Sequence, residues 1–218
     1  MRKLKVKAVL LDFDGTIVDS MRVIHKVLNQ TLRGYGLPEI EPNILGEMAG
    51  QPLASILKKL TPEVSEDVVE GVREKFYRRY LEVSLKETRP FPDTEKTLRY
   101  LNLKGFKVAV VTSTPRKPVL RELKRFNLKK YFDVLVTKED VKNFKPSPEV
   151  VVKALARLGV ENFEAVVVGD SPMDVKAGKA AGTKTVAVAT GLCGFERLTK
   201  EKPDFTIKNL YELREVLA

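Results

Sequence analysis

Two aspartates separated by a single residue follow an apolar run near the start of the chain. Asp12 and Asp14 belong to the segment Asp-Phe-Asp-Gly-Thr, which comes directly after the mostly β-favouring residues 6–11. In open parallel α/β sheets the carboxyl ends of the strands form the ligand crevice, so acids at this point are placed for chemistry. Because Gly15 allows the backbone to turn at once, both carboxylates can face one site. One acid could then attack a substrate or hold a cation while the other handles a proton.

The same segment is compatible with simpler structures. An isolated Asp-x-Asp-Gly is common in surface turns, because Asp and Gly suit turn backbones. An EF-hand calcium loop is a second alternative, and it requires a preceding helix, Gly at its sixth position and Glu at its twelfth. Those two positions hold Ile17 and Val23 here, and a strand-like run precedes them. The calcium loop is therefore excluded.

Three further segments carry polar groups near expected strand ends or helix starts. Thr112 and Ser113 end an apolar run with hydroxyls beside a helix start, a combination suited to phosphate oxygens. Lys145 precedes a proline-rich helix start, where an ammonium would offset the repulsion between carboxylates and phosphate. Asp170 and Asp174 stand four residues apart across the start of a helix, so both can approach one cation. Taken singly, each segment is equally typical of an ordinary helix cap or a solvated lysine.

Short apolar runs alternate with helical segments over most of the chain. Near-continuous Val-rich runs are typical of strands that are buried on both faces. Strands that alternate with helices imply right-handed crossovers and a parallel sheet. The expected strands are Val6 to Leu11, Lys107 to Val111, Val134 to Val136, Ala165 to Val168, and Lys184 to Ala189.

Three hydroxyl-proline pairs predict helix starts. In each pair the Ser or Thr is expected to cap the helix, and the proline to occupy its first turn. Two of the pairs follow an expected strand by a few residues, so their helix amides would face the crevice and favour anions. The pairs are Thr114-Pro115, Ser147-Pro148 and Ser171-Pro172.

The interval between the first two strands is too long for one crossover and contains only helical patterns. We interpret residues 20–89 as an inserted helical domain over the crevice, with hinges near Asp19-Ser20 and Arg89-Pro92. Extra helices packed flat on the sheet are the alternative. One apolar stripe at helical spacing marks the longest helix. It consists of Val68, Val69, Val72, Phe76, Tyr80 and Val83.

Taken together, the four polar segments resemble the four motifs of the haloacid dehalogenase superfamily, in their usual order. The insertion resembles the helical-cap class of that superfamily, with phosphoglycolate phosphatase-like enzymes as the nearest group. The stretch from Gly191 through residues 194–198 to 203–205 is similar to the carboxyl-terminal pattern of that group. The resemblance implies an α/β, Rossmann-like parallel core formed by residues 1–19 and 90–218, and an all-helical cap formed by residues 20–89.

The resemblance also implies roles for the acids. Asp12 would be the nucleophile that attacks phosphorus and forms an aspartyl phosphate. Asp14 would protonate the leaving oxygen and then take a proton from the hydrolytic water. The Asp12 side chain, the Asp14 main-chain carbonyl and Asp170 would bind Mg²⁺, and Asp174 would support the metal directly or through water.

The remaining motif residues would bind the phosphoryl group. By the same resemblance, Thr112, the amide of Ser113 and Lys145 would neutralise it during transfer. Cap closure would exclude bulk water and present the groups that select the substrate. Arg22 and the turn at residues 50–52 are candidate contacts from the cap.

The expected activity is Mg²⁺-dependent hydrolysis of a small phosphometabolite, with phosphoglycolate as the first candidate. The acid at Asp14 favours phosphatase or phosphomutase over dehalogenase, because halide displacement needs no leaving-group proton. Family β-phosphoglucomutases usually have a His at the position of Ile24, whereas His25 is rotated from it by about 100°. That disfavours the mutase, which stays as one alternative, with a non-catalytic phosphometabolite-binding protein as another. Ser113-Thr114 replaces the common Asn-Lys of phosphoglycolate phosphatases.

The chain is basic, with a net charge of +10. Residues 116–130 are rich in Arg and Lys but carry apolar residues at helical spacing, which indicates an amphipathic helix with a solvated basic face. A positive field also concentrates small anionic substrates, so a nucleic-acid partner is not expected. Scarce Gln with abundant Lys and Glu resembles the composition of proteins from hot environments.

Cysteine content and hydropathy suggest a cytoplasmic location. No apolar run approaches the roughly 20 residues that a bilayer-spanning helix requires, so no membrane partner is expected, and a signal peptide is not expected either. The single Cys193 cannot form an internal disulfide, which fits a reducing compartment. Structural roles are expected for Cys193 and for His25, the one histidine.

Overall fold

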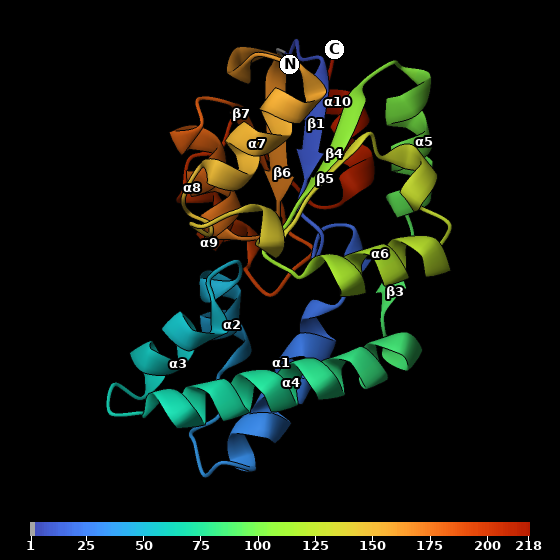
Figure 1. Ribbon diagram of the computed structural model, residues 1–218. Coiled ribbons are helices and arrows are strands. Elements are labelled where there is room, and N and C mark those ends of the chain that lie inside the picture. Colours follow the sequence, from blue (N-terminus) through green and yellow to red (C-terminus); the bar gives the residue numbers. More distant parts are fainter. Residues whose placement is uncertain (1–2) are drawn as a thin grey trace.

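A six-stranded parallel sheet forms the centre of the larger domain (Figure 1). The structure is a computed structural model and describes residues 3–218. The strand order is β5-β4-β1-β6-β7-β8, so the first strand lies in the middle and the ends of β4 and β6 flank it. The strands are β1 Ala8–Leu11, β4 Lys107–Val111, β5 Val134–Val136, β6 Ala165–Gly169, β7 Lys184–Val188 and β8 Phe205–Ile207.

Side chains of the sheet alternate between two apolar layers. Val9 and Leu11 of β1 face a cluster that includes side chains of α5, α6 and α10, whereas Ala8 and Leu10 face a cluster with α7 and α8. Helices on both faces explain why the strands are apolar almost without interruption. These helices are α5 Thr94–Leu103, α6 Arg116–Arg125, α7 Glu149–Leu158, α8 Pro172–Ala180, α9 Phe195–Thr199 and α10 Leu213–Val216, with short 3₁₀ turns at Lys129–Tyr131, Lys138–Asp140, Asn162–Glu164 and Leu210–Glu212.

The predicted α/β fold with a parallel sheet is confirmed, with small differences at its edges. All five expected strands are present, although the first begins at Ala8 rather than Val6 and the last expected one ends at Val188. The edge strand β8 was not predicted, because its three residues Phe-Thr-Ile do not form the continuous apolar run that marks the three-residue strand β5. Over residues 3–218, no helix combines the length and the hydropathy that crossing a bilayer requires.

Four helices form the insertion between β2 and β3, and they lie below the sheet in Figure 1. They share a hydrophobic cluster of their own, which contains no residue of the six sheet strands, so the helices do not lie flat on the sheet. Of the predicted stripe, Val69, Val72, Phe76 and Tyr80 are buried, and Val68 and Val83 are half-buried. The elements are β2 Val18–Asp19, α1 Met21–Arg33, α2 Pro42–Met48, α3 Leu53–Leu60, α4 Glu66–Glu87 and β3 Arg89–Pro90.

Two adjacent chain crossings connect this helical cap to the core. Strand β2 pairs antiparallel with β3, so that Val18 lies opposite Pro90 and Asp19 opposite Arg89. The crossings therefore coincide with the two predicted hinge segments. The exact domain boundaries, residues 1–19 and 90–218 for the core and 20–89 for the cap, stay a prediction.

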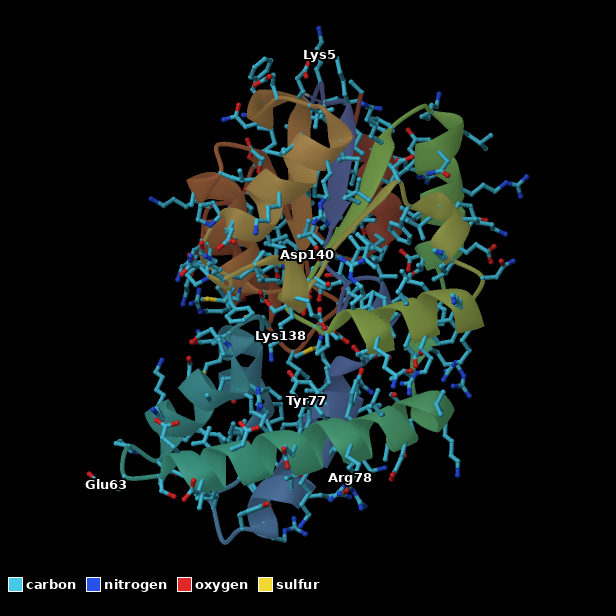
Figure 2. The ribbon with its side chains drawn as sticks, in the orientation of Figure 1. Lys5, Glu63, Tyr77, Arg78, Lys138 and Asp140 are labelled. Atoms are coloured by element: carbon cyan, nitrogen blue, oxygen red, sulfur yellow. The ribbon has the colours of Figure 1, made fainter. Side chains whose placement is uncertain are left out.

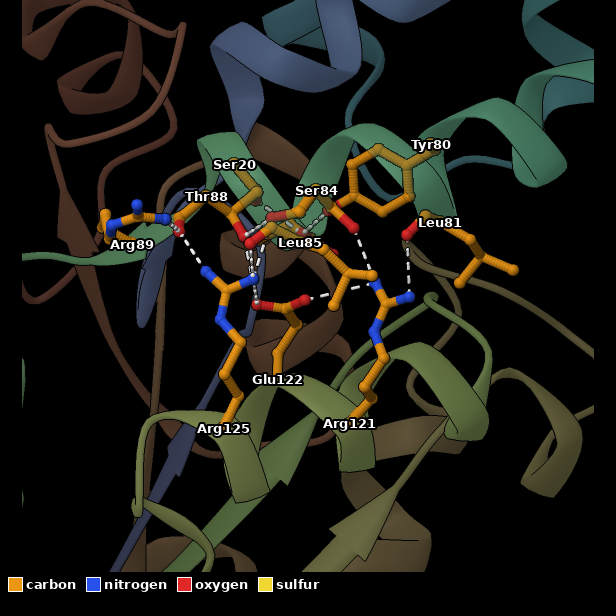
Figure 3. Close-up of polar contacts among 11 residues, drawn as sticks. Ser20, Tyr80, Leu81, Ser84, Leu85, Thr88, Arg89, Arg121, Glu122 and Arg125 are labelled. Carbon is orange, nitrogen blue, oxygen red and sulfur yellow. Dashed lines mark hydrogen bonds and ion pairs between the residues drawn. The ribbon is translucent and has the colours of Figure 1, made fainter.

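Helix α6 of the core holds the carboxyl-terminal end of the cap helix α4 (Figure 3). The last carbonyls of a helix lack partners within the helix and carry partial negative charge, which suits guanidinium donors. Arg121 donates to the carbonyl of Leu81 at 2.8 Å, and Arg125 to that of Thr88 at 2.6 Å. The buried Glu122 accepts a hydrogen bond from the Thr88 hydroxyl at 3.0 Å. The basic face predicted to be solvated therefore includes two arginines that bind the cap.

Helix caps at the three hydroxyl-proline pairs are confirmed in only one case. Ser171 caps α8 and forms a reciprocal capping box with Asp174. Helices α6 and α7 begin one residue later than predicted, and Pro115 and Pro148 themselves occupy the capping position. Near the start of α6, the Thr114 hydroxyl is directed toward Asp14, to which it donates a hydrogen bond at 2.6 Å.

Candidate active site

The loop after β1 places Asp12 and Asp14 at the edge of the sheet that faces the cap. The amide of Asp12 continues the ladder by donating to the carbonyl of Val168 at 2.9 Å. Three residues further on, Gly15 has a φ of +79°, which side chains rarely tolerate, and its amide donates to the carbonyl of Val18. The two carboxylates have different partners, since Asp12 contacts Lys145 and Asp14 contacts Thr114.

Asp12 meets two other acids that the sequence separates widely. Carboxylate oxygens of Asp12, Asp170 and Asp174 all lie within 4.8 Å of one another. Asp170 follows β6, which pairs directly with β1, and Asp174 lies in the first turn of α8. Ser171 holds Asp174 in place through its hydroxyl, 2.5 Å from Oδ2, and through its amide at 3.1 Å. The predicted convergence of these three side chains is confirmed.

Lys145 lies between two of these acids. Its Nζ is 2.8 Å from Asp12 Oδ1 and 2.6 Å from Asp174 Oδ1, and it also donates to the carbonyl of Val111 at 2.8 Å. The side chain is only 1% exposed. Burial by itself would lower the pKa of Lys145, but the carboxylates of Asp12 and Asp174 outweigh burial and raise it above its ordinary value. The side chain is therefore a fixed positive charge at the site.

One ammonium does not balance three carboxylates. Burial raises the pKa of Asp12 to about 7, although Lys145 counteracts the shift. Burial also raises the pKa of Asp170 well above its ordinary value. Among the described residues, Thr16 is the one side chain that donates to Asp170, at 2.9 Å. If all three carboxylates are ionised, the cluster has two surplus negative charges, which a hard divalent cation such as Mg²⁺ would neutralise through oxygen ligands. The residues present therefore fit the predicted cofactor.

Two glycines leave room for the Asp170 carboxylate. A Cβ at Gly15 or at Gly191 would lie in direct contact with Asp170 Oδ2. Gly191 belongs to the stretch that follows β7, so that stretch reaches the Asp170 carboxylate. A side chain at either position would have to displace the acid.

Replacing Gly191 by alanine is expected to weaken Mg²⁺ binding by about tenfold or more, because a displaced carboxylate loses its place in the cluster. Mg²⁺ titration followed by calorimetry measures the effect. The matched control is Gly194→Ala, since a Cβ at Gly194 has no neighbour within 4 Å. Equal affinities for Mg²⁺ in wild type and Gly191→Ala would show that Gly191 does not protect the acid cluster.

Asp14 belongs to a separate group of hydrogen bonds rather than to the acid cluster. It accepts from Ser20 at 2.6 Å, from Thr114 at 2.6 Å and from the Tyr80 hydroxyl of the cap at 3.5 Å. Burial raises the pKa of Asp14, and the three hydroxyls reduce the shift. Of the four predicted metal-binding residues, three thus bring their side chains together, and the predicted contact through the Asp14 carbonyl stays a prediction.

The segment Thr112-Ser113, which is predicted to bind phosphate, lies between core and cap. Thr112 is 2% exposed, and its hydroxyl accepts from the amide of Thr114 at 3.1 Å. The Ser113 hydroxyl donates to the carbonyl of Gly50 in the cap at 2.8 Å. Both residues line the cavity described below, so the structure brings them to the site of Asp12.

Four residues that contact the acids were not among the predicted site residues, namely Thr16, Ser20, Tyr80 and Thr114. Thr16 and Thr114 lie inside the motif segments, so their hydroxyls could have been included on position alone. For Ser20 only a place in a hinge was predicted, and for Tyr80 only a place in an apolar helix stripe. Nothing in the local sequence indicates that the hydroxyl of Tyr80 crosses from the cap to Asp14.

A cavity of about 130 Å³ lies between core and cap, over the two aspartates. The predicted cap contact Gln51 lines it, whereas Arg22 is exposed and does not. Ile24 lines it as well, while Nε2 of His25 lies 2.7 Å from the carbonyl of Ile40 within the cap. The preference for a phosphatase over a mutase stays a prediction. The lining comprises Asp12, Asp14, Met21, Ile24, Leu28, Leu45, Ala49, Gly50, Gln51, Leu53, Ile56, Phe76, Tyr77, Tyr80, Thr112, Ser113, Thr114, Pro118 and Ser171.

The chain belongs to the haloacid dehalogenase-like hydrolase family, whose model matches residues 9–188. A phosphoglycolate phosphatase from Aquifex aeolicus is 37% identical over 213 residues, which is 97% of this chain and 97% of that protein. The pyrophosphatase PpaX from Bacillus pumilus is 34% identical over 218 residues, 100% of this chain and 99% of its own length. A crystal structure of a hydrolase from Pseudomonas syringae has the same fold, with a TM-score of 0.88, 22% identity and coverage of 97% of this chain and 100% of that one. The expectation of a phosphatase of this family is confirmed.

Proposed function

We propose that this protein is a Mg²⁺-dependent phosphomonoester hydrolase that acts on a small phosphometabolite through an aspartyl-phosphate intermediate. The observation that carries the proposal is the cluster of Asp12, Asp170, Asp174 and Lys145, of which Asp12 lines the cavity. Phosphoryl transfer depends mainly on positioning and on neutralising charge, and this cluster supplies both.

Asp12 and Asp14 divide the covalent and the proton-transfer work. A carboxylate oxygen of Asp12 attacks phosphorus, and the bond to the leaving oxygen breaks as Asp14 gives that oxygen a proton. Asp14 then takes a proton from the water that attacks the aspartyl phosphate, which releases inorganic phosphate and restores Asp12. The separate surroundings of Asp14, with Ser20, Thr114 and Tyr80, support a role distinct from that of Asp12.

The remaining residues of the site hold the phosphoryl group and the cofactor. Thr112, the amide of Ser113 and Lys145 bind the oxygens of the phosphoryl group. Asp12, the carbonyl of Asp14 and Asp170 hold Mg²⁺, with Asp174 as direct or indirect support. When bound, the cation neutralises the charge of the phosphate and of the clustered acids. The cap, residues 20–89, covers the site and excludes bulk water during the reaction.

Phosphoglycolate and inorganic pyrophosphate are the first two compounds to assay, because relatives at 37% and 34% identity are named for them. Ser113-Thr114 stand where phosphoglycolate phosphatases commonly have Asn-Lys, so phosphoglycolate is the first candidate substrate rather than an assigned one. The mutase alternative predicts transfer of phosphate between positions of one sugar. A non-catalytic protein would bind such ligands without turnover, although every motif acid and Lys145 are present.

The test is release of inorganic phosphate from a panel of phosphomonoesters and pyrophosphate, with millimolar Mg²⁺ and after removal of metal by a chelator. We expect hydrolysis of at least one phosphomonoester that disappears with the chelator and returns when Mg²⁺ is added. Tight binding of panel members without any phosphate release would contradict the proposed function, as would release that is unaffected by removing the metal.

A further inference from the structure

The walls of the cavity have a chemical character that narrows the substrate class. Building on the proposed function, we propose that the preferred leaving group is an apolar or aromatic alcohol without a second anionic group. The polar part of the lining, from Asp12 and Asp14 to Thr112 and Ser113, lies where the phosphoryl group binds. The part contributed by the cap is mainly aliphatic and aromatic.

The apolar wall reaches into the hydrophobic cluster of the cap. Leu28, Leu45 and Ile56 line the cavity, and each of them is at most 5% exposed. They belong to three different cap helices, so the cavity enters the space where α1, α2 and α3 meet. An apolar leaving group in this space gains free energy by burying apolar area, and an anionic one would lose hydration without meeting an opposite charge.

Aromatic residues of α4 form another side of the cavity. The rings of Phe76 and Tyr80 are stacked, with centroids 5.9 Å apart and an angle of 15° between their planes. Tyr77 meets Phe76 edge to face at 5.3 Å. All three residues line the cavity, and aromatic walls favour planar apolar groups through offset stacking and edge contacts.

No cationic side chain lines this cavity among the described residues 3–218. Lys145 contacts Asp12 on the core side, where the phosphoryl group binds, and does not line the cavity. Lys138 of the core lies over the ring of Tyr77, with Nζ 5.5 Å from the centroid, and stays outside the lining (Figure 2). The carboxylate of phosphoglycolate or the second phosphate of pyrophosphate would therefore have no opposite charge on the cap side.

Equilibrium binding of two non-hydrolysable probes tests this preference without turnover. Phenylphosphonate carries an apolar group and phosphonoacetate a carboxylate, and both offer a phosphonate to the motif residues. In the presence of Mg²⁺ we expect wild type to bind phenylphosphonate about tenfold or more tightly than phosphonoacetate. Equal affinities, or tighter binding of phosphonoacetate, would overturn the inference whatever the outcome of the phosphate-release assay.

A charge placed on the cap wall should reverse the preference. Leu53 of α3 is half-buried and lines the cavity. We expect Leu53→Lys to raise the affinity for phosphonoacetate and to lower the affinity for phenylphosphonate. The ratio of the two affinities should change by about tenfold. The matched control is Leu60→Lys, a half-buried leucine of the same helix outside the lining, which should leave the ratio unchanged. An unchanged ratio in Leu53→Lys, or an equal change in both variants, would contradict the proposed subsite. Failure of wild type to hydrolyse any phosphomonoester would instead contradict the proposed function alone.

Discussion

Replacement of Asp12 by asparagine is expected to lower kcat by on the order of 10⁴-fold. The amide of asparagine is a poor nucleophile, so the aspartyl phosphate does not form. The two side chains have nearly the same shape, and the contact of Oδ1 with Lys145 can be kept by the amide oxygen. Phosphate release with millimolar Mg²⁺ and the best substrate of the panel measures the loss, and a melting curve checks that the variant is folded.

An acid seven residues further along the chain, Asp19, provides the matched control for Asp12→Asn. Asp19 lies on β2, is exposed and does not line the cavity, so Asp19→Asn removes an equal charge while leaving kcat within about twofold of wild type. Hydrolysis by Asp12→Asn at the rate of wild type would show that Asp12 is not the nucleophile. An equal loss in Asp19→Asn would point to a general effect of charge on the loop.

The largest effect on stability is expected for Lys145→Met. Without magnesium the free energy of unfolding should fall by about 3–5 kcal/mol, because breaking a buried ion pair leaves an uncompensated buried charge. Here the loss affects two acids, since Nζ contacts both Asp12 and Asp174, and the lysine side chain is 1% exposed. Urea denaturation in the presence of a chelator measures the difference.

Added Mg²⁺ separates this electrostatic effect from a loss of packing. Without the ammonium the acid cluster carries one more uncompensated negative charge, so a divalent cation should stabilise Lys145→Met more than it stabilises wild type. Lys142→Met is the control, because Lys142 is exposed and three residues earlier in the same segment. A free energy of unfolding within 1 kcal/mol of wild type, with no added response to Mg²⁺, would rule out the proposed electrostatic role of Lys145.

The sequence by itself determined the parallel sheet, the helical insertion and the positions of the motif acids. Buried strands such as Ala165–Gly169 can be predicted from their own residues, because a sheet covered on both faces requires apolar side chains throughout the strand. The position of Asp170 at the end of that strand followed from the same run. Adjacent parallel strands bring their carboxyl ends to one edge, so the convergence of Asp12 with Asp170 could be predicted from order alone.

Only the tertiary structure decided which hydroxyls contact those acids and what covers them. Thr114 was expected to cap a helix, but Asp14, one hundred residues earlier in the chain, is its partner, and the cap shifted to Pro115. Tyr80 reaches Asp14 from the cap, and the apolar wall above the site is formed where three cap helices meet. These contacts depend on the relative placement of elements far apart in sequence. Local propensity and periodicity carry no information about that placement, because they describe only neighbours along the chain.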